Sequence, residues 1–249
     1  MEKITSRKNP YIINIRALEK DADYRYEAGE FVCDGLKLLK EAVLFGAEIT
    51  SVLWKGKAED MLPDVGQYVV PDDLFEYISP MKNSPGPLFT VKIPEEDWKT
   101  GIKKAIILET VQDPGNVGTV IRSAGAFNID AVILCNGCAD PFSPKAVRST
   151  MGAVFRQRII KTDINGTKEL LDKNLLPLYG AALSDKAESI EGLNLSACAV
   201  AIGSEGQGLS RGMLDICEKE IIIPMNENSE SLNAAVASAV IMWEMRDRK

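Results

Sequence analysis

IIIPMNENSESLNAAVASAVIMWE, residues 221–244, is the segment from which the architecture of the chain can be inferred. Its opening run of isoleucines is apolar, β-branched and closed by Pro224, which predicts a buried strand over 221–223 in a mainly parallel sheet. A polar loop follows, with Ser229 or Ser231 as the expected N-cap of a helix. Such a loop lies past the carboxyl end of a strand, where open α/β sheets bind ligands.

The helix expected over residues 231–245 follows from apolar residues that recur at helical spacing. Small residues such as Ala234 and Ser238 would let another backbone approach closely, either against this helix or within an oligomer. The stripe predicted to be buried consists of Leu232, Val236, Val240 and Trp243, with Ala235 and Ala239 between them.

Alternating buried strands, loops and helices extend back from this segment to residue 103. Helices are expected near 116–127 and 166–174, between runs of strand-forming residues. This order of elements predicts an α/β domain built on a parallel sheet. The apolar runs that predict its strands are 105–108, 131–134, 176–179, 199–202 and 221–223.

The front of the chain predicts a smaller α/β module. Its helices are expected over 35–45 and 71–77, and its strands over 31–33, 49–54 and 68–70, with a further candidate at 88–93. The proline-rich segment 79–100 has little periodicity and predicts a domain boundary. We therefore expect a first domain over 1–90, a linker over 91–102 and a second domain over 103–249.

The composition excludes several classes of chemistry. The 249 residues include no histidine, which excludes Ser-His-Asp and Cys-His catalysis and histidine metal triads. Cys135 and Cys138 form a C-x-x-C pair, but structural zinc normally uses four Cys or His ligands, so we predict no metal. The cysteines lie mostly in apolar segments, as reduced thiols do, and neither a membrane span nor a signal peptide is recognisable. These features predict a cytoplasmic protein.

The net charge of −7 argues against binding nucleic acid through bulk charge, but two segments are locally basic. Residues 143–161 hold five basic residues and no acidic one, although a solvated surface would give the same pattern. Near the N-terminus, basic residues are interleaved with tyrosines, which suits RNA and equally suits an ordinary amphipathic helix. The candidates for RNA contacts are Arg7, Lys8, Arg25, Lys145 and Arg148.

Two loops of the second half carry residues suited to chemistry. In 109–127, a Pro-Gly turn precedes Asn116, the expected N-cap of a helix on which Arg122 points outward. In 201–210, AIGSEGQGLS, glycines permit close approach of a ligand, but their spacing matches neither a P-loop nor the dinucleotide fingerprint. Glu205 among them could orient a substrate, act as a base or cap a turn.

Three motifs, in this order, resemble those of the SpoU (TrmH-like) RNA ribose methyltransferases of the SPOUT superfamily. They are N-x-G-x-x-x-R at 116–122, I-G-S-E-G-x-G at 202–208, and I-P-M followed by S-L-N within 223–233. The resemblance covers about residues 103–246. Residues 1–90 resemble, less specifically, the L30e-like substrate-binding domain that often precedes this catalytic domain.

The resemblance implies a trefoil-knotted, parallel-sheet α/β domain that forms a homodimer and acts on RNA. It implies transfer of a methyl group from S-adenosylmethionine to a ribose 2′-hydroxyl, in ribosomal RNA in preference to tRNA. The residues that would hold the cofactor, largely through backbone groups, are Gly203, Ile223 and Leu232. Those that would surround the reacting ribose are Asn116, Arg122, Glu205, Ser231 and Asn233.

Two versions of the proton transfer stay open. The family resemblance implies that Arg122 accepts the proton with help from a substrate phosphate, although arginine stays protonated in proteins. Alternatively, Arg122 orients the phosphate while Glu205 or water accepts the proton. A catalytically silent RNA-binding protein is the competing function, and the presence of both residues with Asn116 and Asn233 argues against it. A dinucleotide enzyme would need the glycine fingerprint that the chain lacks.

Overall fold

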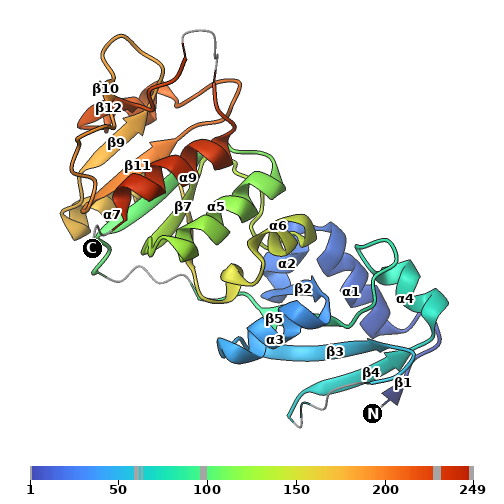
Figure 1. Cartoon of the computed structure of the whole chain (residues 1–249). Coiled ribbons are helices and arrows are strands. Elements are labelled where there is room, and N and C mark those ends of the chain that lie inside the picture. The colour runs from blue at the N-terminus through green and yellow to red at the C-terminus, as the bar shows by residue number, and fades with distance from the viewer. Residues whose placement is uncertain (1, 59–61, 63, 96–99, 227–230, 247–249) are drawn as a thin grey trace. The chain divides into compact units, whose positions relative to one another are not determined.

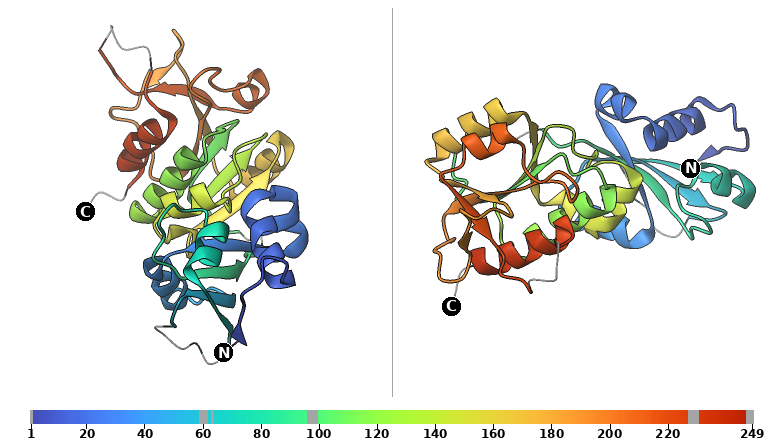
Figure 2. Two further views of the ribbon diagram at one scale, coloured as in Figure 1. Left: turned by 90° about the vertical axis from the view of Figure 1, so that its right-hand side faces the viewer. Right: turned by 90° about the horizontal axis from the view of Figure 1, so that it is seen from above.

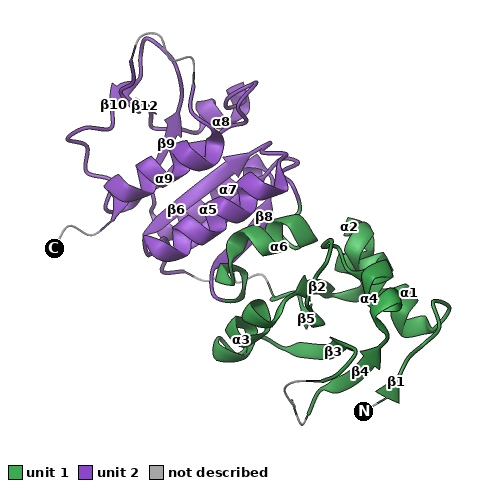
Figure 3. Ribbon diagram, turned by 45° about the vertical axis from the view of Figure 1, so that its right-hand side comes forward, with its two compact units in different colours: residues 1–95, 140–155 green, residues 96–139, 156–249 purple. Residues whose placement is uncertain are grey.

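The chain forms two compact units in the computed structural model (Figures 1 and 2), which describes residues 2–58, 62, 64–95, 100–226 and 231–246. The first unit comprises residues 1–95 and 140–155, and the second comprises 96–139 and 156–249 (Figure 3). The chain first passes between them at residues 95 and 96, inside the predicted linker. Residues 140–155 were predicted to lie in the second domain, but they belong to the first unit.

The first unit is built on a mixed five-stranded sheet. Its order is β1 (Glu2–Lys3), β4 (Gly66–Val70), β3 (Ile49–Lys55), β5 (Leu88–Lys92) and β2 (Glu30–Asp34). Strand β5 is antiparallel to both neighbours, and the other pairs are parallel. The helices of this unit are α1 (Pro10–Lys20), α2 (Ala22–Ala28), α3 (Leu36–Leu44), α4 (Asp72–Ile78) and α6 (Pro144–Thr150), with a short turn of 3-10 helix at Ala153–Phe155.

The N-terminal segment of interleaved basic and aromatic residues is helical, as one of its two interpretations predicted. Helix α1 buries Ile12, Ile15 and Leu18, which recur at helical spacing, and Asn9 caps its start. Arg7 and Lys8 therefore lie exposed in the turn before this helix.

Residues 140–155 belong to the first unit, where side-chain contacts hold them. Arg25 Nη2 lies 2.6 Å from Asp140 Oδ2, and the Tyr26 hydroxyl donates to Asp140 Oδ1 at 2.9 Å. The ring centroids of Phe142 and Phe31 are 5.0 Å apart. Because Arg25 and Asp140 are 115 residues apart in sequence, local patterns could not have predicted their pairing.

The second unit is built on a seven-stranded sheet in which every neighbouring pair is parallel. The predicted parallel α/β fold is therefore confirmed. In spatial order its strands are β10 (Glu188–Ser189), β12 (Lys219–Ile222), β9 (Leu178–Ala181), β11 (Cys198–Ile202), β6 (Lys104–Glu109), β7 (Ala131–Cys135) and β8 (Arg158–Thr162).

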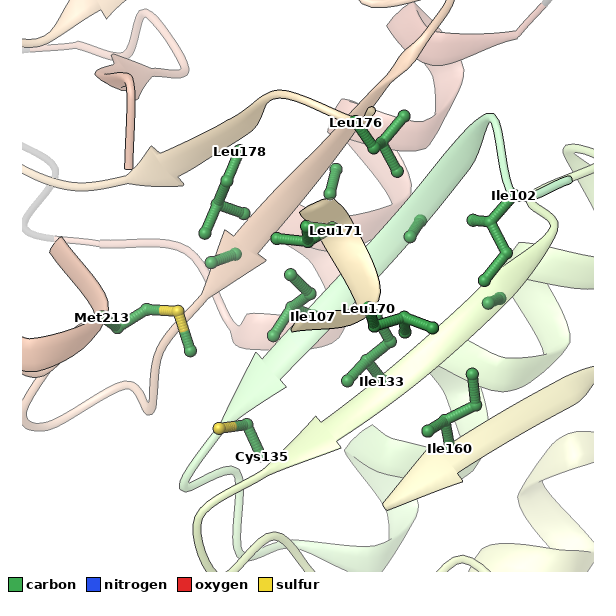
Figure 4. Packing of buried hydrophobic residues seen from close by; sticks show 14 residues of the cluster. Ile102, Ile107, Ile133, Cys135, Ile160, Leu170, Leu171, Leu176, Leu178 and Met213 are labelled. Carbon is green, nitrogen blue, oxygen red and sulfur yellow. The ribbon is translucent and has the colours of Figure 1, made fainter. Parts of the chain in front are cut away.

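Helices cover both faces of this sheet. Helices α7 (Ile164–Asn174) and α8 (Arg211–Asp215) supply leucines and a methionine to a buried cluster on one face (Figure 4). Helices α5 (Pro114–Ala126) and α9 (Ala234–Met245) pack against each other and against the strands (Figure 1). Each fully buried Ile or Leu side chain in such a core contributes about 1.5–3 kcal/mol. In the described part of the chain, no helix combines the length and apolarity that a membrane span requires.

The predicted buried stripe of α9 is wrong except at Ala235, which is buried. Val236 and Trp243 are 48% and 51% exposed. The helix is apolar on nearly all sides, so periodicity alone could not select the face that packs. Small residues are buried near the start of the helix, where they allow close helix packing, and larger apolar residues are buried towards its end. The buried residues are Ala234, Ala235, Ser238, Ile241, Met242 and Met245.

Candidate active site

A cavity of about 440 Å³ opens at the carboxyl ends of β9, β11 and β12. The three residues predicted to hold a cofactor, Gly203, Ile223 and Leu232, all belong to its lining. The rest of the lining combines apolar side chains with the backbone of the loop after β11, and the volume lies in the range of small-molecule sites. Apolar walls beside main-chain donors and acceptors fit the adenosyl group of S-adenosylmethionine, which has apolar faces and polar edges.

The loop after β11, residues 203–208, folds back on itself at one wall of this cavity. Gly208 N donates a hydrogen bond to Ser204 O at 2.8 Å, which closes the loop. A Cβ atom at Gly203 would lie 2.0 Å from the carbonyl carbon of Gly208, whereas one at Gly206 would meet no atom within 4 Å. The shape of the loop therefore requires glycine at 203 and tolerates a side chain at 206.

Glu205, in this loop, joins the three motif segments. Its Oε1 accepts hydrogen bonds from Asn116 Nδ2 at 3.0 Å, Asn233 Nδ2 at 2.5 Å and Ala234 N at 3.2 Å. Asn233 Nδ2 also donates to Asn116 Oδ1 at 3.2 Å. Among the described residues, none donates a hydrogen bond to Glu205 Oε2, and the residue is exposed. The protein thus holds one carboxylate oxygen of Glu205, and the other accepts no hydrogen bond from the described residues.

The start of α5 explains why Asn116 can reach Glu205. The predicted N-cap, Asn116, is wrong: Asp113 caps the helix, and its Oδ1 accepts a hydrogen bond from Asn116 N at 3.0 Å. Pro114 occupies the first helical position, which suits proline because its nitrogen has no hydrogen to donate. The side chain of Asn116 is therefore free of capping and lies beside the loop of Glu205.

The N-cap of α9 is Asn233, so the prediction of Ser231 was wrong, and Ser229 lies outside the described residues. Asn233 Oδ1 accepts hydrogen bonds from Ala235 N at 3.0 Å and Val236 N at 3.3 Å. Its Nδ2 donates a hydrogen bond to Glu205 Oε1. An amide has both an acceptor and donors, so one side chain starts the helix and fixes the carboxylate.

The two remaining catalytic candidates, Ser231 and Arg122, differ in whether they line the cavity. Ser231 is exposed and belongs to the lining of the cavity. Arg122 is exposed on α5 and forms no hydrogen bond or ion pair with any residue that the structure describes, and the cavity lining does not include it. Four of the five predicted residues therefore gather around the loop of Glu205, and Arg122 stays outside the cluster within one chain.

The predicted RNA-binding residues separate into an exposed group and one buried residue. Arg7, Lys8, Lys145 and Arg148 are exposed, and all four belong to the first unit. Arg25 is 3% exposed, and its guanidinium donates to Asp140 and to the carbonyl oxygen of Leu18. Arg25 was wrongly predicted to contact RNA, because an arginine in an amphipathic segment can also serve a buried acceptor.

Of the two C-x-x-C cysteines, Cys135 is buried and Cys138 is partly buried. Burial raises the pKa of the Cys135 thiol to about 11 and also raises the pKa of Cys138. A protonated thiol is a poor nucleophile and a poor metal ligand at neutral pH. Within the described ranges, no group of three or more His, Cys, Asp or Glu side chains is arranged to hold a metal ion.

Sequence reasoning missed two residues at the edge of the site, Glu109 and Ser210. Glu109 is 1% exposed at the end of β6 and accepts hydrogen bonds from Ser210. The sequence held one signal, an acidic residue that directly follows the apolar run of a buried strand. A buried carboxylate at the carboxyl end of a parallel strand points to a specific partner.

Comparisons with known proteins agree with the motifs found in the sequence. The model of the SpoU rRNA Methylase family matches residues 103–243. The 23S rRNA (guanosine(2553)-2'-O)-methyltransferase RlmP of Bacillus subtilis is 28% identical over 249 residues, which cover 99% of this chain and 100% of that protein.

Solved structures share the fold over nearly the whole chain. A protein of the TrmH family from Porphyromonas gingivalis has a TM-score of 0.84 at 29% identity, covering 96% of this chain and 98% of the other. The SpoU methyltransferase AviRb from Streptomyces viridochromogenes, solved in complex with AdoMet, has a TM-score of 0.87 at 24% identity, covering 96% and 97%.

The resemblance inferred from the three motifs is therefore confirmed, as is an RNA methyltransferase activity. The family model spans the strands, the cavity and the Glu205 cluster of the second unit. The chain belongs to the SpoU rRNA methylase family.

Proposed function

We propose that the protein transfers a methyl group from S-adenosylmethionine to a ribose 2′-hydroxyl of ribosomal RNA. The observation that carries the proposal is the cluster of Asn116, Glu205 and Asn233 beside a cavity that fits the cofactor. The whole-chain similarity to a 23S rRNA 2'-O-methyltransferase supports ribosomal RNA as the substrate. When bound, the cofactor supplies an already activated methyl group. The chain must then align the ribose and accept one proton.

The geometry favours Glu205 as the group that accepts the proton. Its Oε1 is held by three donors, so the side chain is fixed, while Oε2 is open to a hydroxyl. Arginine stays protonated in proteins, so Arg122 is better suited to hold a substrate phosphate. In this assignment Arg122 orients the RNA backbone, and Asn116 and Asn233 keep Glu205 in place.

The direct test is to map 2′-O-methyl groups in RNA from a strain that lacks this protein. One ribosomal RNA nucleotide should lose its methyl group, and the wild-type chain should restore it, while an Arg122→Ala chain should not. If the methyl group were lost from a tRNA instead, tRNA and not ribosomal RNA would be the substrate. An unchanged methylation pattern in both RNAs, with no cofactor binding by the purified chain, would favour the silent RNA-binding alternative.

Asn233→Ser should separate the structural role of this residue from its role at the site. Serine caps helices about as well as asparagine, so the free energy of unfolding should change by less than about 0.5 kcal/mol. The variant cannot donate an amide hydrogen to Glu205, so the methyl-transfer rate should fall at least about tenfold. Asn233→Ala should lose the cap as well, at about 1 kcal/mol.

Urea unfolding and single-turnover rates measure the two effects of the Asn233 variants separately. A full methyl-transfer rate in Asn233→Ser would remove the amide of Asn233 from the proposed site.

We propose that the first unit binds RNA through its exposed basic residues. Lys145 and Arg148 lie on α6, which belongs to the same compact unit as Arg7 and Lys8. The double variant Lys145→Ala/Arg148→Ala should weaken RNA binding about tenfold and lower the slope of log K against log salt concentration by about 1.5, as two lost phosphate contacts require. Filter binding at several salt concentrations measures both quantities.

Lys168→Ala/Lys173→Ala is the matched control, because it removes two exposed charges from α7 in the second unit. It changes net charge equally and should leave the slope unchanged. An equal effect of both double variants would mean that α6 acts only through overall charge.

We also propose that the protein forms a homodimer through the second unit. Val236, Ala239, Val240 and Trp243 of α9, with Thr119 of α5, line an open apolar groove, and Val236 and Trp243 are about half exposed. An exposed apolar stripe of this kind is typical of an interaction surface. Sedimentation equilibrium should give twice the chain mass, and Val236→Asp should give the chain mass.

The family resemblance also implies a knot in the second unit, a fold for the first unit and a location in the cell. We propose that the second unit contains the trefoil knot, supported by a strand order in which β12, the last strand, lies between β10 and β9. We propose that the first unit is an L30e-like domain that binds RNA. We propose that the second unit carries out methyl transfer. The protein is proposed to act in the cytoplasm, where ribosomal RNA is available.

A further inference from the structure

Glu109 is a buried carboxylate whose charge is stabilised by neutral hydrogen-bond donors. It ends β6 and is 1% exposed. Oε2 accepts a hydrogen bond from Ser210 N at 2.8 Å, and Oε1 accepts from Ser210 Oγ at 2.7 Å and Asn136 Nδ2 at 3.3 Å. No lysine or arginine in the described ranges forms an ion pair with it. Because a buried charge requires such hydrogen bonds, the position of Ser210 is closely specified.

Ser210 lies just after the closed loop 203–208. By accepting hydrogen bonds from Ser210, Glu109 fixes the C-terminal end of that loop. The other attachment is at Glu205, whose contacts are exposed and compete with water. Both attachments use a carboxylate, but hydrogen bonds to the buried one are stronger, because its surroundings are less polar than water. Three glycines give the free loop a large conformational entropy, which an anchor must offset.

The same carboxylate connects three loops at the carboxyl edge of the sheet. Glu109 precedes the loop that leads to Asn116, Asn136 lies in the loop after β7, and Ser210 lies in the loop after β11. A displacement of Glu109 would therefore move the two segments that bring Asn116 and Glu205 together.

We infer that Glu109 is a positioning residue for the cofactor loop: by holding Ser210 it keeps residues 203–208 in their closed shape before the cofactor binds. The identity of the cofactor rests on the proposed function, but the order of the loop in the free protein does not. A loop ordered in advance costs less entropy on binding, so Glu109 contributes to cofactor affinity without touching the cofactor.

Ser210→Ala and Glu109→Gln test the inference from both partners. In each variant, amide hydrogen exchange of residues 203–209 in the cofactor-free protein should become at least about tenfold faster. The Kd for S-adenosylmethionine, measured by calorimetry, should rise about tenfold. The double variant should raise the Kd by less than the product of the two single effects, because both variants weaken the contact between the same two side chains. Ser210→Thr keeps the hydroxyl and should restore both values to within about twofold.

Asp163→Ala is the matched control, because Ser210→Ala also removes the N-cap of α8, whose Met213 N donates to Ser210 Oγ. Asp163 caps α7 in the same unit through Gly166 N at 2.8 Å and does not contact the loop. It should lower Tm while leaving loop exchange and Kd unchanged. Unchanged exchange in Ser210→Ala and Glu109→Gln, or an equal rise in Kd for Asp163→Ala, would overturn the inference. If the wild type bound no S-adenosylmethionine, the proposed function would fail, and the exchange measurement would still decide the role of Glu109.

Discussion

Arg122→Ala should reduce methyl transfer at least about a hundredfold while leaving the Kd for S-adenosylmethionine within about threefold of the wild-type value. Arg122 is exposed on α5 and outside the cavity lining, so its loss removes no wall of the cofactor site. No residue in the described part of the chain pairs with its guanidinium, which leaves that group available to an RNA phosphate. Single-turnover rates with a ribosomal RNA fragment and calorimetry with the cofactor measure the two quantities.

Arg122→Lys distinguishes the two assignments of the proton acceptor. If Arg122 must lose a proton, the lysine variant should regain activity as the pH rises, because lysine deprotonates at lower pH than arginine. If Arg122 holds a phosphate through its planar fork, the lysine variant should stay slow at every pH. For Arg122→Ala, the control for the loss of one positive charge is Lys168→Ala, an exposed change on α7. Unchanged turnover in Arg122→Ala would exclude both roles.

The strands at the centre of the second sheet were predictable because they are buried on both faces. Residues Ala105 to Leu108 and Ala199 to Val200 are fully buried, and such continuous apolar runs are typical of parallel strands. β8 was missed because it lies at the edge of the sheet and carries Arg158 and Lys161. Charged residues are common on edge strands, and here they resembled an exposed basic stripe.

Helix positions were predictable, whereas their caps and packing faces were not. The apolar spacing located α5 and α9, but Asp113 caps the first and Asn233 the second. Several polar residues stand before each helix, and only the fold selects the one whose oxygen meets the free N–H groups. The buried face of α9 depends on its packing against α5, which local sequence does not contain.

The site was predictable as a set of motifs but not as a network. The resemblance grouped Asn116, Glu205 and Asn233, which the structure brings into hydrogen-bond contact. The pattern of basic and aromatic residues could not separate exposed from buried arginines, because Arg25 pairs with Asp140, which lies far away in the sequence but in the same compact unit. Glu109 was missed for the same reason, because its partner Ser210 lies 101 residues away in the sequence.

Gly203→Ala should raise the Kd for S-adenosylmethionine at least about a hundredfold. The added Cβ atom would lie 2.0 Å from the carbonyl carbon and 2.1 Å from the oxygen of Gly208. Backbone atoms cannot move aside as the end of a side chain can, so the loop must open and the wall of the cavity must shift. The strain should also lower the free energy of unfolding by about 1–3 kcal/mol. Calorimetry and urea unfolding measure these effects.

Gly206→Ala is the control within the same loop, because its Cβ atom would meet no atom within 4 Å. It reduces the flexibility of the loop just as Gly203→Ala does, without the clash, so its Kd should stay within about fivefold of the wild-type value. Equal losses in the two variants would show that the loop needs glycine for flexibility. A loss confined to Gly203→Ala would show that the cofactor site depends on the closed shape of residues 203–208, in which Gly208 N pairs with Ser204 O.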